Sequence, residues 1–217
     1  MELFKQLVGL ASYPIPHAVM ISLLKGYKRP NDKIHELISC KVIIPLRKGL
    51  YVTGPAIGNI KPSLILLANH IMGPSYVSMD FALSYNGLIP EKVFEISSMT
   101  TKTTKKFENT FGVFTYTHAP LPYYSYGIRQ SFLPGFVDAN KHFALIASAE
   151  KALCDKIIYT KGLTFRGKQD VYRFLFEDLR LDSELLQNLN TIEIESWLNR
   201  APKKSSLNFL LKTLRAL

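Results

Sequence analysis

Apolar residues in the N-terminal part of the chain recur first at helical spacing and then in two short runs. Leu3, Leu7 and Leu10 lie three or four positions apart, which predicts a helix with one buried face. In chain order, the pattern predicts a helix over residues 1–11, a helix over residues 17–24, a helix opened by Pro30 and Asn31, and a hairpin with strands at 42–46 and 50–52.

The third of these helices has one apolar and one polar side. Ile34, Leu37 and Ile38 share a face, so we expect them in the core. The outward side then carries Asp32, Lys33, His35, Glu36 and Ser39. Three helices followed by a basic hairpin, with Gly26 in the turn before the third helix, are typical of a winged helix-turn-helix.

Beyond a linker at residues 54–62, which holds two Gly and two Pro, helix and strand patterns mix. Ser63 is placed to cap a helix running to about Met72, and Ser78 to cap another that stops at Asn86. Strands are predicted at residues 93–97, 111–117, 122–129, 135–138 and 143–146, and helices at 148–159, 168–179, 182–188, 193–200 and 206–216. The expected fold is α+β, with a winged helix-turn-helix at residues 1–54 and a mixed α/β domain with a helical C-terminal tail at residues 62–217.

Composition limits the class of protein. Of the 217 residues 47% are hydrophobic, which is typical of a folded chain rather than a disordered one. Two cysteines exclude a disulfide scaffold and a cysteine-rich zinc module. Neither a membrane-spanning apolar run nor a cleavable export signal is recognisable, so we expect a cytoplasmic protein without a membrane partner.

The positive charge is concentrated at the two ends of the chain. The formal net charge is +10, and residues 1–61 hold nine basic side chains against three acidic ones. Residues 200–217 hold five basic side chains and no acid. Such asymmetry predicts an anionic partner, most often nucleic acid, although solvated surface charge is the alternative for each residue.

The predicted third helix and hairpin tip place several polar side chains where a winged helix contacts DNA. The residues expected to contact double-stranded DNA are Lys28, Arg29, Asn31, Lys33, His35, Arg47 and Lys48. Asp32 and Glu36 lie on the same face and would repel phosphates.

The C-terminal helix is amphipathic, with leucines on one side and Lys204, Lys212 and Arg215 on the other. Packing against the second domain explains the leucines. The three cations could supply an auxiliary DNA contact.

Three segments carry a resemblance to a known family. They read VIIPLRKGLYV at residues 42–52, GPSYVSMDFALSYNGLIP at residues 73–90 and IASAEKALCD at residues 146–155. In order and spacing these segments resemble the AbiEi-type antitoxin family over about residues 1–160.

This resemblance implies the antitoxin of a type IV toxin–antitoxin, or abortive-infection, system. It implies an N-terminal winged helix that represses its own operon at inverted repeats, with Arg47 and Lys48 as the basic residues of the wing. It also implies a C-terminal domain that counters a nucleotidyltransferase-like toxin without forming a stable complex. No catalytic residue, metal or cofactor is implied.

Two alternatives remain at this stage. The first is a metal-dependent nuclease using Asp138, Glu150 and Lys151, although an adjacent acid and lysine on a helix point about 100° apart. The second is an interaction module whose second domain binds a protein partner. Lys151 and Asp155, four residues apart, are expected to be a helix-surface ion pair worth a few tenths of a kcal/mol.

Overall fold

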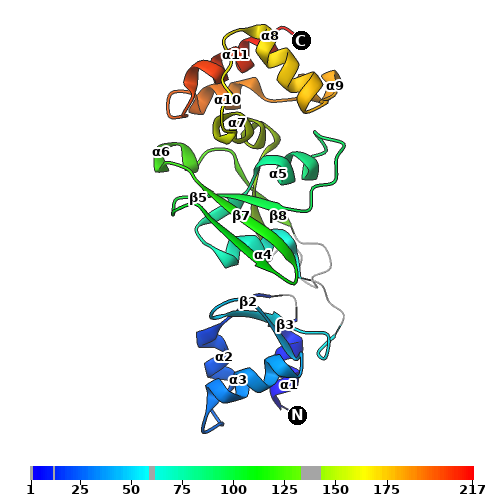
Figure 1. Ribbon diagram of the computed structural model, residues 1–217, viewed down its shortest axis with the longest axis vertical. Coiled ribbons are helices and arrows are strands. Elements are labelled where there is room, and N and C mark those ends of the chain that lie inside the picture. Colours follow the sequence, from blue (N-terminus) through cyan, green and yellow to red (C-terminus); the bar gives the residue numbers. More distant parts are fainter. Residues whose placement is uncertain (1, 12, 59–61, 133–142) are drawn as a thin grey trace.

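The computed structural model describes residues 2–11, 13–58, 62–132 and 143–217. The molecule is elongated, with an N-terminal unit at one end of its long axis and the C-terminal helices at the other (Figure 1). A mixed β-sheet with its own helices lies between them. The architecture is therefore α+β, as the sequence predicts.

The N-terminal unit is three helices packed on a small antiparallel sheet. Its elements are α1 (Glu2–Gly9), β1 (Ile15–Pro16), α2 (His17–Leu23), α3 (Pro30–Ser39), β2 (Ile43–Arg47) and β3 (Leu50–Thr53). The strand order is β1-β3-β2. The three helices and the hairpin are confirmed, whereas β1 is an addition. Its two residues lie at the sheet edge, where Pro16 costs no ladder hydrogen bond.

A separate apolar core holds this unit together. Ile34 and Leu37 are buried as predicted, while Ile38 is half-buried. They pack against Leu7 of α1 and Met20 of α2. Helical spacing therefore identified the inner face of α3.

The second unit is built on a six-stranded mixed sheet of order β6-β7-β5-β4-β9-β8. Its strands are β4 (Ser75–Val77), β5 (Ile96–Thr100), β6 (Lys105–Asn109), β7 (Gly112–His118), β8 (Ile128–Phe132) and β9 (Phe143–Ala147). Its helices are α4 (Leu64–Ile71), α5 (Met79–Tyr85), α6 (Leu121–Tyr124), α7 (Ala149–Tyr159), α8 (Lys168–Tyr172), α9 (Ser183–Gln187), α10 (Thr191–Trp197) and α11 (Lys204–Leu214), with a π-helical segment at Arg173–Asp178. The pairs β4–β9 and β5–β7 are parallel.

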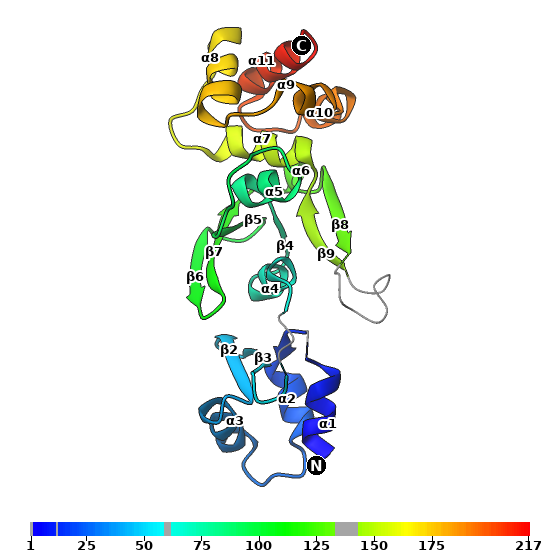
Figure 2. The ribbon, with the colours of Figure 1, turned by 90° about the vertical axis from the view of Figure 1, so that its right-hand side faces the viewer.

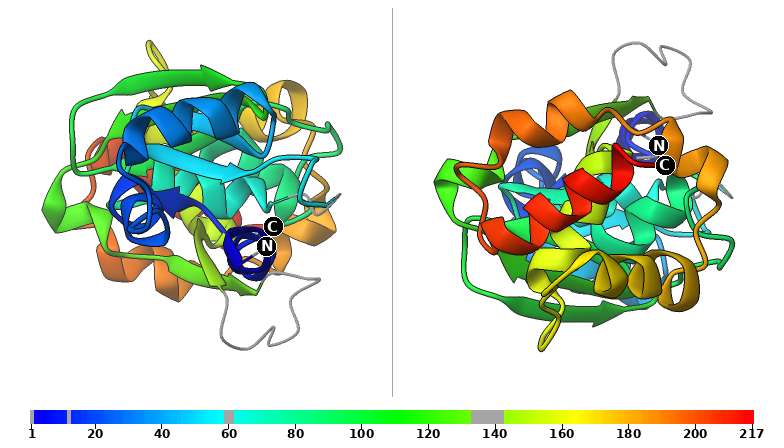
Figure 3. Two further views of the ribbon diagram at one scale, coloured as in Figure 1. Left: turned by 90° about the horizontal axis from the view of Figure 1, so that it is seen from below. Right: turned by 90° about the horizontal axis from the view of Figure 1, so that it is seen from above.

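Helix α7 lies between the sheet and the C-terminal helices (Figures 1 and 2). Seen from above, α8, α10 and α11 cover the C-terminal end of the molecule (Figure 3, right). The buried side of α11 is formed by leucines such as Leu207, Leu210 and Leu211, as its spacing predicts.

Several predictions of local structure are wrong. The strand at residues 122–129 is instead the helix α6 followed by β8, and the strand at 93–97 is shifted to β5. Strands β4 and β6 were not predicted, because one has only three residues and the other reads KKFEN. The predicted strand at 135–138 lies outside the described residues. Ser78 precedes α5 but does not cap it with its side chain.

Candidate nucleic-acid interface

The outward side of α3 and the loop before it form an exposed polar surface of the N-terminal unit. Helix α3 lies on the side of β2 and β3 that faces away from the second unit (Figure 1). Lys28, Asn31 and His35 are exposed, and within the described part of the chain their side chains have no polar partner. These three side chains are therefore free to reach a ligand.

The other two predicted contacts on this face are held by acids. Arg29 Nη1 lies 3.7 Å from the Asp32 carboxylate. Lys33 Nζ donates to Glu36 Oε1 at 2.6 Å, and this hydrogen bond raises the pKa of Lys33. Ion pairs this exposed are weak, so a phosphate can displace either carboxylate, although Asp32 and Glu36 would still repel it.

The hairpin tip is turned toward the second unit. Arg47 Nε donates to the backbone carbonyl of Ile71, at the end of α4, at 2.6 Å, and its Nη1 donates to the carbonyl of Lys48 at 3.0 Å. Asn109 Nδ2 of β6 donates to the carbonyl of Leu46 at 3.1 Å. Sequence reasoning missed this attachment of Arg47. Lys48 is exposed and has no polar side-chain partner among the described residues.

A cleft of about 1030 Å³ opens where the hairpin tip meets the second unit. It is lined by Arg47, Lys48, Ile71, Met72, Gly73, Thr101, Lys102, Thr103, Thr104, Lys105, Phe107 and His118. Four of these described lining residues are Lys or Arg and none is acidic. The segment KTTKK at residues 102–106 is the one sequence signal that could have pointed to it.

Contacts within the cleft hold its cations in place. Lys102 Nζ donates to the carbonyl of Gly73 at 2.5 Å. Lys105 Nζ lies 4.9 Å from the centroid of the Phe107 ring. The His118 ring nitrogen Nδ1 is 3.1 Å from the carbonyl of Lys102. The positive charge of both lysines is uncompensated by any carboxylate among the described residues.

The cations of α11 are not brought to this surface. Figures 1 and 2 place α11 at the end of the molecule opposite α3. Arg215 is paired with Glu195 at 2.6 Å, and Lys204 donates to Asn199 at 2.5 Å, whereas Lys212 is exposed. A duplex seated across α3 alone does not reach these three cations.

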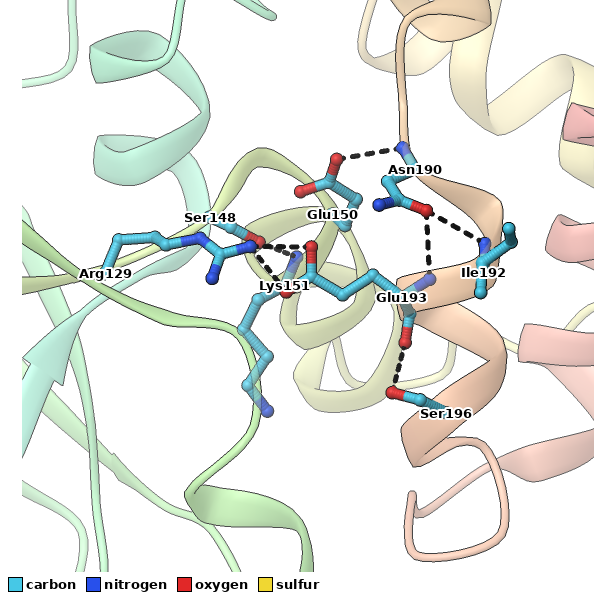
Figure 4. A network of polar contacts seen from close by, with 8 residues as sticks. All are labelled: Arg129, Ser148, Glu150, Lys151, Asn190, Ile192, Glu193 and Ser196. Carbon is cyan, nitrogen blue, oxygen red and sulfur yellow. Dashed lines mark hydrogen bonds and ion pairs between the residues drawn. The ribbon is translucent and has the colours of Figure 1, made fainter.

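Glu150 and Lys151, two of the residues suggested for a nuclease, are not brought together in the structure. Figure 4 shows Glu150 and Lys151 pointing to different sides of α7. Glu150 accepts a hydrogen bond of 2.9 Å from the backbone N–H of Asn190, at the start of α10. Within the described ranges, no three His, Cys, Asp or Glu residues form a group that could hold a metal ion. Asp138 lies outside the described residues.

The Lys151–Asp155 pair is fully buried, so the prediction of a surface pair is wrong. Lys151 Nζ lies 3.1 Å from Asp155 Oδ1 and 3.0 Å from the centroid of the Tyr123 ring. Asp155 Oδ2 accepts hydrogen bonds from the Tyr76 hydroxyl at 3.0 Å and from Ser78 Oγ at 2.7 Å. Burial lowers the pKa of Lys151 and raises that of Tyr76 well above its ordinary value. The cluster fastens α7 to β4 and α6.

No model of a known protein family matches the chain, and neither does any curated protein. The fold is similar to the crystal structure of the RV2827C protein from Mycobacterium tuberculosis, with a TM-score of 0.58 and 13% sequence identity over 98% of this chain and 76% of that one. At this identity the likeness concerns the fold alone. None of the helices in the described ranges is long and apolar enough to span a membrane.

Proposed function

We propose that the N-terminal unit is a winged helix that binds double-stranded DNA, with α3 as its recognition helix. The order helix, strand, helix, helix, strand, strand, with the sheet order β1-β3-β2, supports this assignment. The observation that carries the proposal is that Lys28 before α3, Asn31 in its first turn and His35 on its outward side are exposed and unpaired among the described residues. In helix-turn-helix proteins this part of the recognition helix contacts base edges.

We further propose that the chain is the autorepressor and antitoxin of a type IV toxin–antitoxin system and acts in the cytoplasm without catalysing a reaction. The three segments similar to the AbiEi-type family support this. Its functional partner is then a nucleotidyltransferase-like toxin, opposed without a stable complex. Co-expression with the product of the adjacent gene tests this: growth should be rescued, and the two proteins should not co-purify. Co-purification would favour an interaction module instead.

DNA binding is tested by fluorescence anisotropy with a duplex from the region upstream of the gene and a duplex of shuffled sequence. The chain should prefer its own region, and the affinity should fall steeply with salt because phosphate contacts release counterions. Lys28→Ala should weaken binding to both duplexes. His35→Ala should reduce the preference between them.

Lys212→Ala is the matched control. This lysine is exposed, lacks a polar side-chain partner in the described ranges, and lies at the opposite end of the molecule. Equal affinity of the wild-type chain for both duplexes, or equal effects of the Lys28 and Lys212 substitutions, would contradict the proposal.

A further inference from the structure

We propose that the cleft between the hairpin tip and β6 holds a sugar–phosphate strand of the same duplex that α3 contacts, so that the second unit forms part of the DNA-binding surface. This inference rests on the proposed function. The sequence alone does not show that the hairpin and residues 101–107 lie close together, because about 50 positions separate them.

The cleft lies on the same side of the molecule as α3. In Figure 2, α3, β2 and β6 lie along one edge, whereas α1, β8 and β9 lie along the other. The view from below agrees, with α3 and the green strands β6 and β7 at one edge and α1 at the opposite one (Figure 3, left). A duplex running along this edge would meet the recognition helix and the cleft together.

The electrostatics of the cleft favour a polyanion. Its cations come from both walls, with Arg47 and Lys48 on the hairpin and Lys102 and Lys105 on the second unit. On α3, by contrast, two cations are paired with acids. Threonine hydroxyls line the cleft between the cations and are suitable donors to phosphate oxygens.

The lining of the cleft provides groups that suit a sugar–phosphate strand. Two of its lining residues carry rings: Phe107 packs edge-on against Tyr116 at 5.7 Å between ring centroids, and the His118 ring nitrogen Nδ1 lies 3.1 Å from the carbonyl of Lys102. The described lining thus offers cations and threonine hydroxyls for phosphate contacts, which position a duplex without reading its sequence.

The experiment compares Lys102→Ala with Lys105→Ala, made together, against the matched pair Lys204→Ala with Lys212→Ala. Both pairs remove two positive charges, and each contains one lysine that donates a hydrogen bond in the described structure. Affinity for the upstream duplex is measured by anisotropy at several salt concentrations.

Each phosphate contact contributes about 0.9 to the slope of log affinity against log salt. Loss of two contacts should lower that slope by about 1.8, so the fall in affinity from 50 to 200 mM salt should be roughly tenfold smaller. The control pair should leave the slope unchanged. Thermal melting of both variants checks folding, and Lys105→Gln alone, which breaks no hydrogen bond of the described structure, should show about half of the change.

The outcomes separate this inference from the proposed function. If the wild-type chain does not prefer the upstream duplex, the proposed function fails. Suppose instead that the wild type prefers the upstream duplex and that Lys28→Ala weakens binding to it. If the cleft pair then behaves as the control pair does, only the cleft assignment fails. Binding of inorganic tripolyphosphate that depends on Lys102 and Lys105, with DNA binding unaffected, would identify a small phosphorylated ligand and overturn the inference.

Discussion

The buried carboxylate of Asp155 allows a sharp test of how the second unit is held together. Asp155→Ala removes the acceptor of two buried hydroxyls and the partner of a fully buried ammonium. Breaking a buried ion pair by removing one partner typically costs about 3–5 kcal/mol, because the remaining charge is left uncompensated. Each orphaned hydroxyl adds a cost of about 1–3 kcal/mol, partly relieved by relaxation. We therefore expect a loss of at least about 3 kcal/mol in the free energy of unfolding.

Urea unfolding, followed by circular dichroism, measures this loss, with the m-value checking that the same surface unfolds. The double variant Lys151→Met with Asp155→Leu removes both charges at similar volume. It should recover about half of the lost stability. Replacing a buried ion pair by apolar residues is often nearly neutral, but the hydroxyls of Tyr76 and Ser78 would still lack their acceptor. A single-variant loss below about 1 kcal/mol, or a double variant as unstable as the sum of the two single changes, would refute the reasoning.

Three further predictions concern stability. Gly127→Ala should lower the free energy of unfolding by more than about 1 kcal/mol, because φ is +62° and the new Cβ would lie 2.6 Å from Lys151 Cβ. The control Gly26→Ala would place its Cβ with no atom within 4 Å, so it should leave stability in urea unfolding nearly unchanged. Asn190 caps α10 with two hydrogen bonds of 3.1 Å, so Asn190→Ala should lower the melting temperature by the equivalent of about 1 kcal/mol; an unchanged melting temperature would contradict this. Burial raises the pKa of the Cys154 thiol from 9.0 to about 12. Between these two pH values the thiol is protonated in the folded chain but largely ionised in the unfolded chain, so the folded state loses stability as pH rises. The stability of the wild type relative to Cys154→Ala should therefore fall by up to about 1.4 kcal/mol per pH unit above pH 9, and equal pH slopes would contradict it.

Local pattern predicted the N-terminal unit well because its elements are set by local chemistry. The leucine spacing of α1 and the proline at the start of α3 both act within a few residues. The strand predicted at residues 122–129 was wrong because tyrosines favour strands only where a neighbouring strand packs against them. Here Pro122 lies in the first turn of α6, a position that suits proline, and Tyr123 is buried from a helix.

The candidate site was predictable only in its local parts. His35 could be placed because α3 fixes it, and Lys28 because it lies only two residues before that helix begins. The cleft could not be found, because tertiary packing brings Lys48 and Lys105 to the same place. The i,i+4 spacing of Lys151 and Asp155 is the same for a surface pair and a buried one, so charge spacing could not show that the pair is buried.

The hairpin belongs to both units, and this shapes how they act together. Tyr51 packs into the N-terminal core, while Leu46, Leu50 and Val52 pack into the core of the second unit. All four residues of β3 are therefore buried, although the sheet has only three strands. Burying each of these aliphatic side chains contributes about 1.5–3 kcal/mol. The two cores are separate, but the hairpin contributes side chains to both, so its packing sets the position of α3 relative to the cleft.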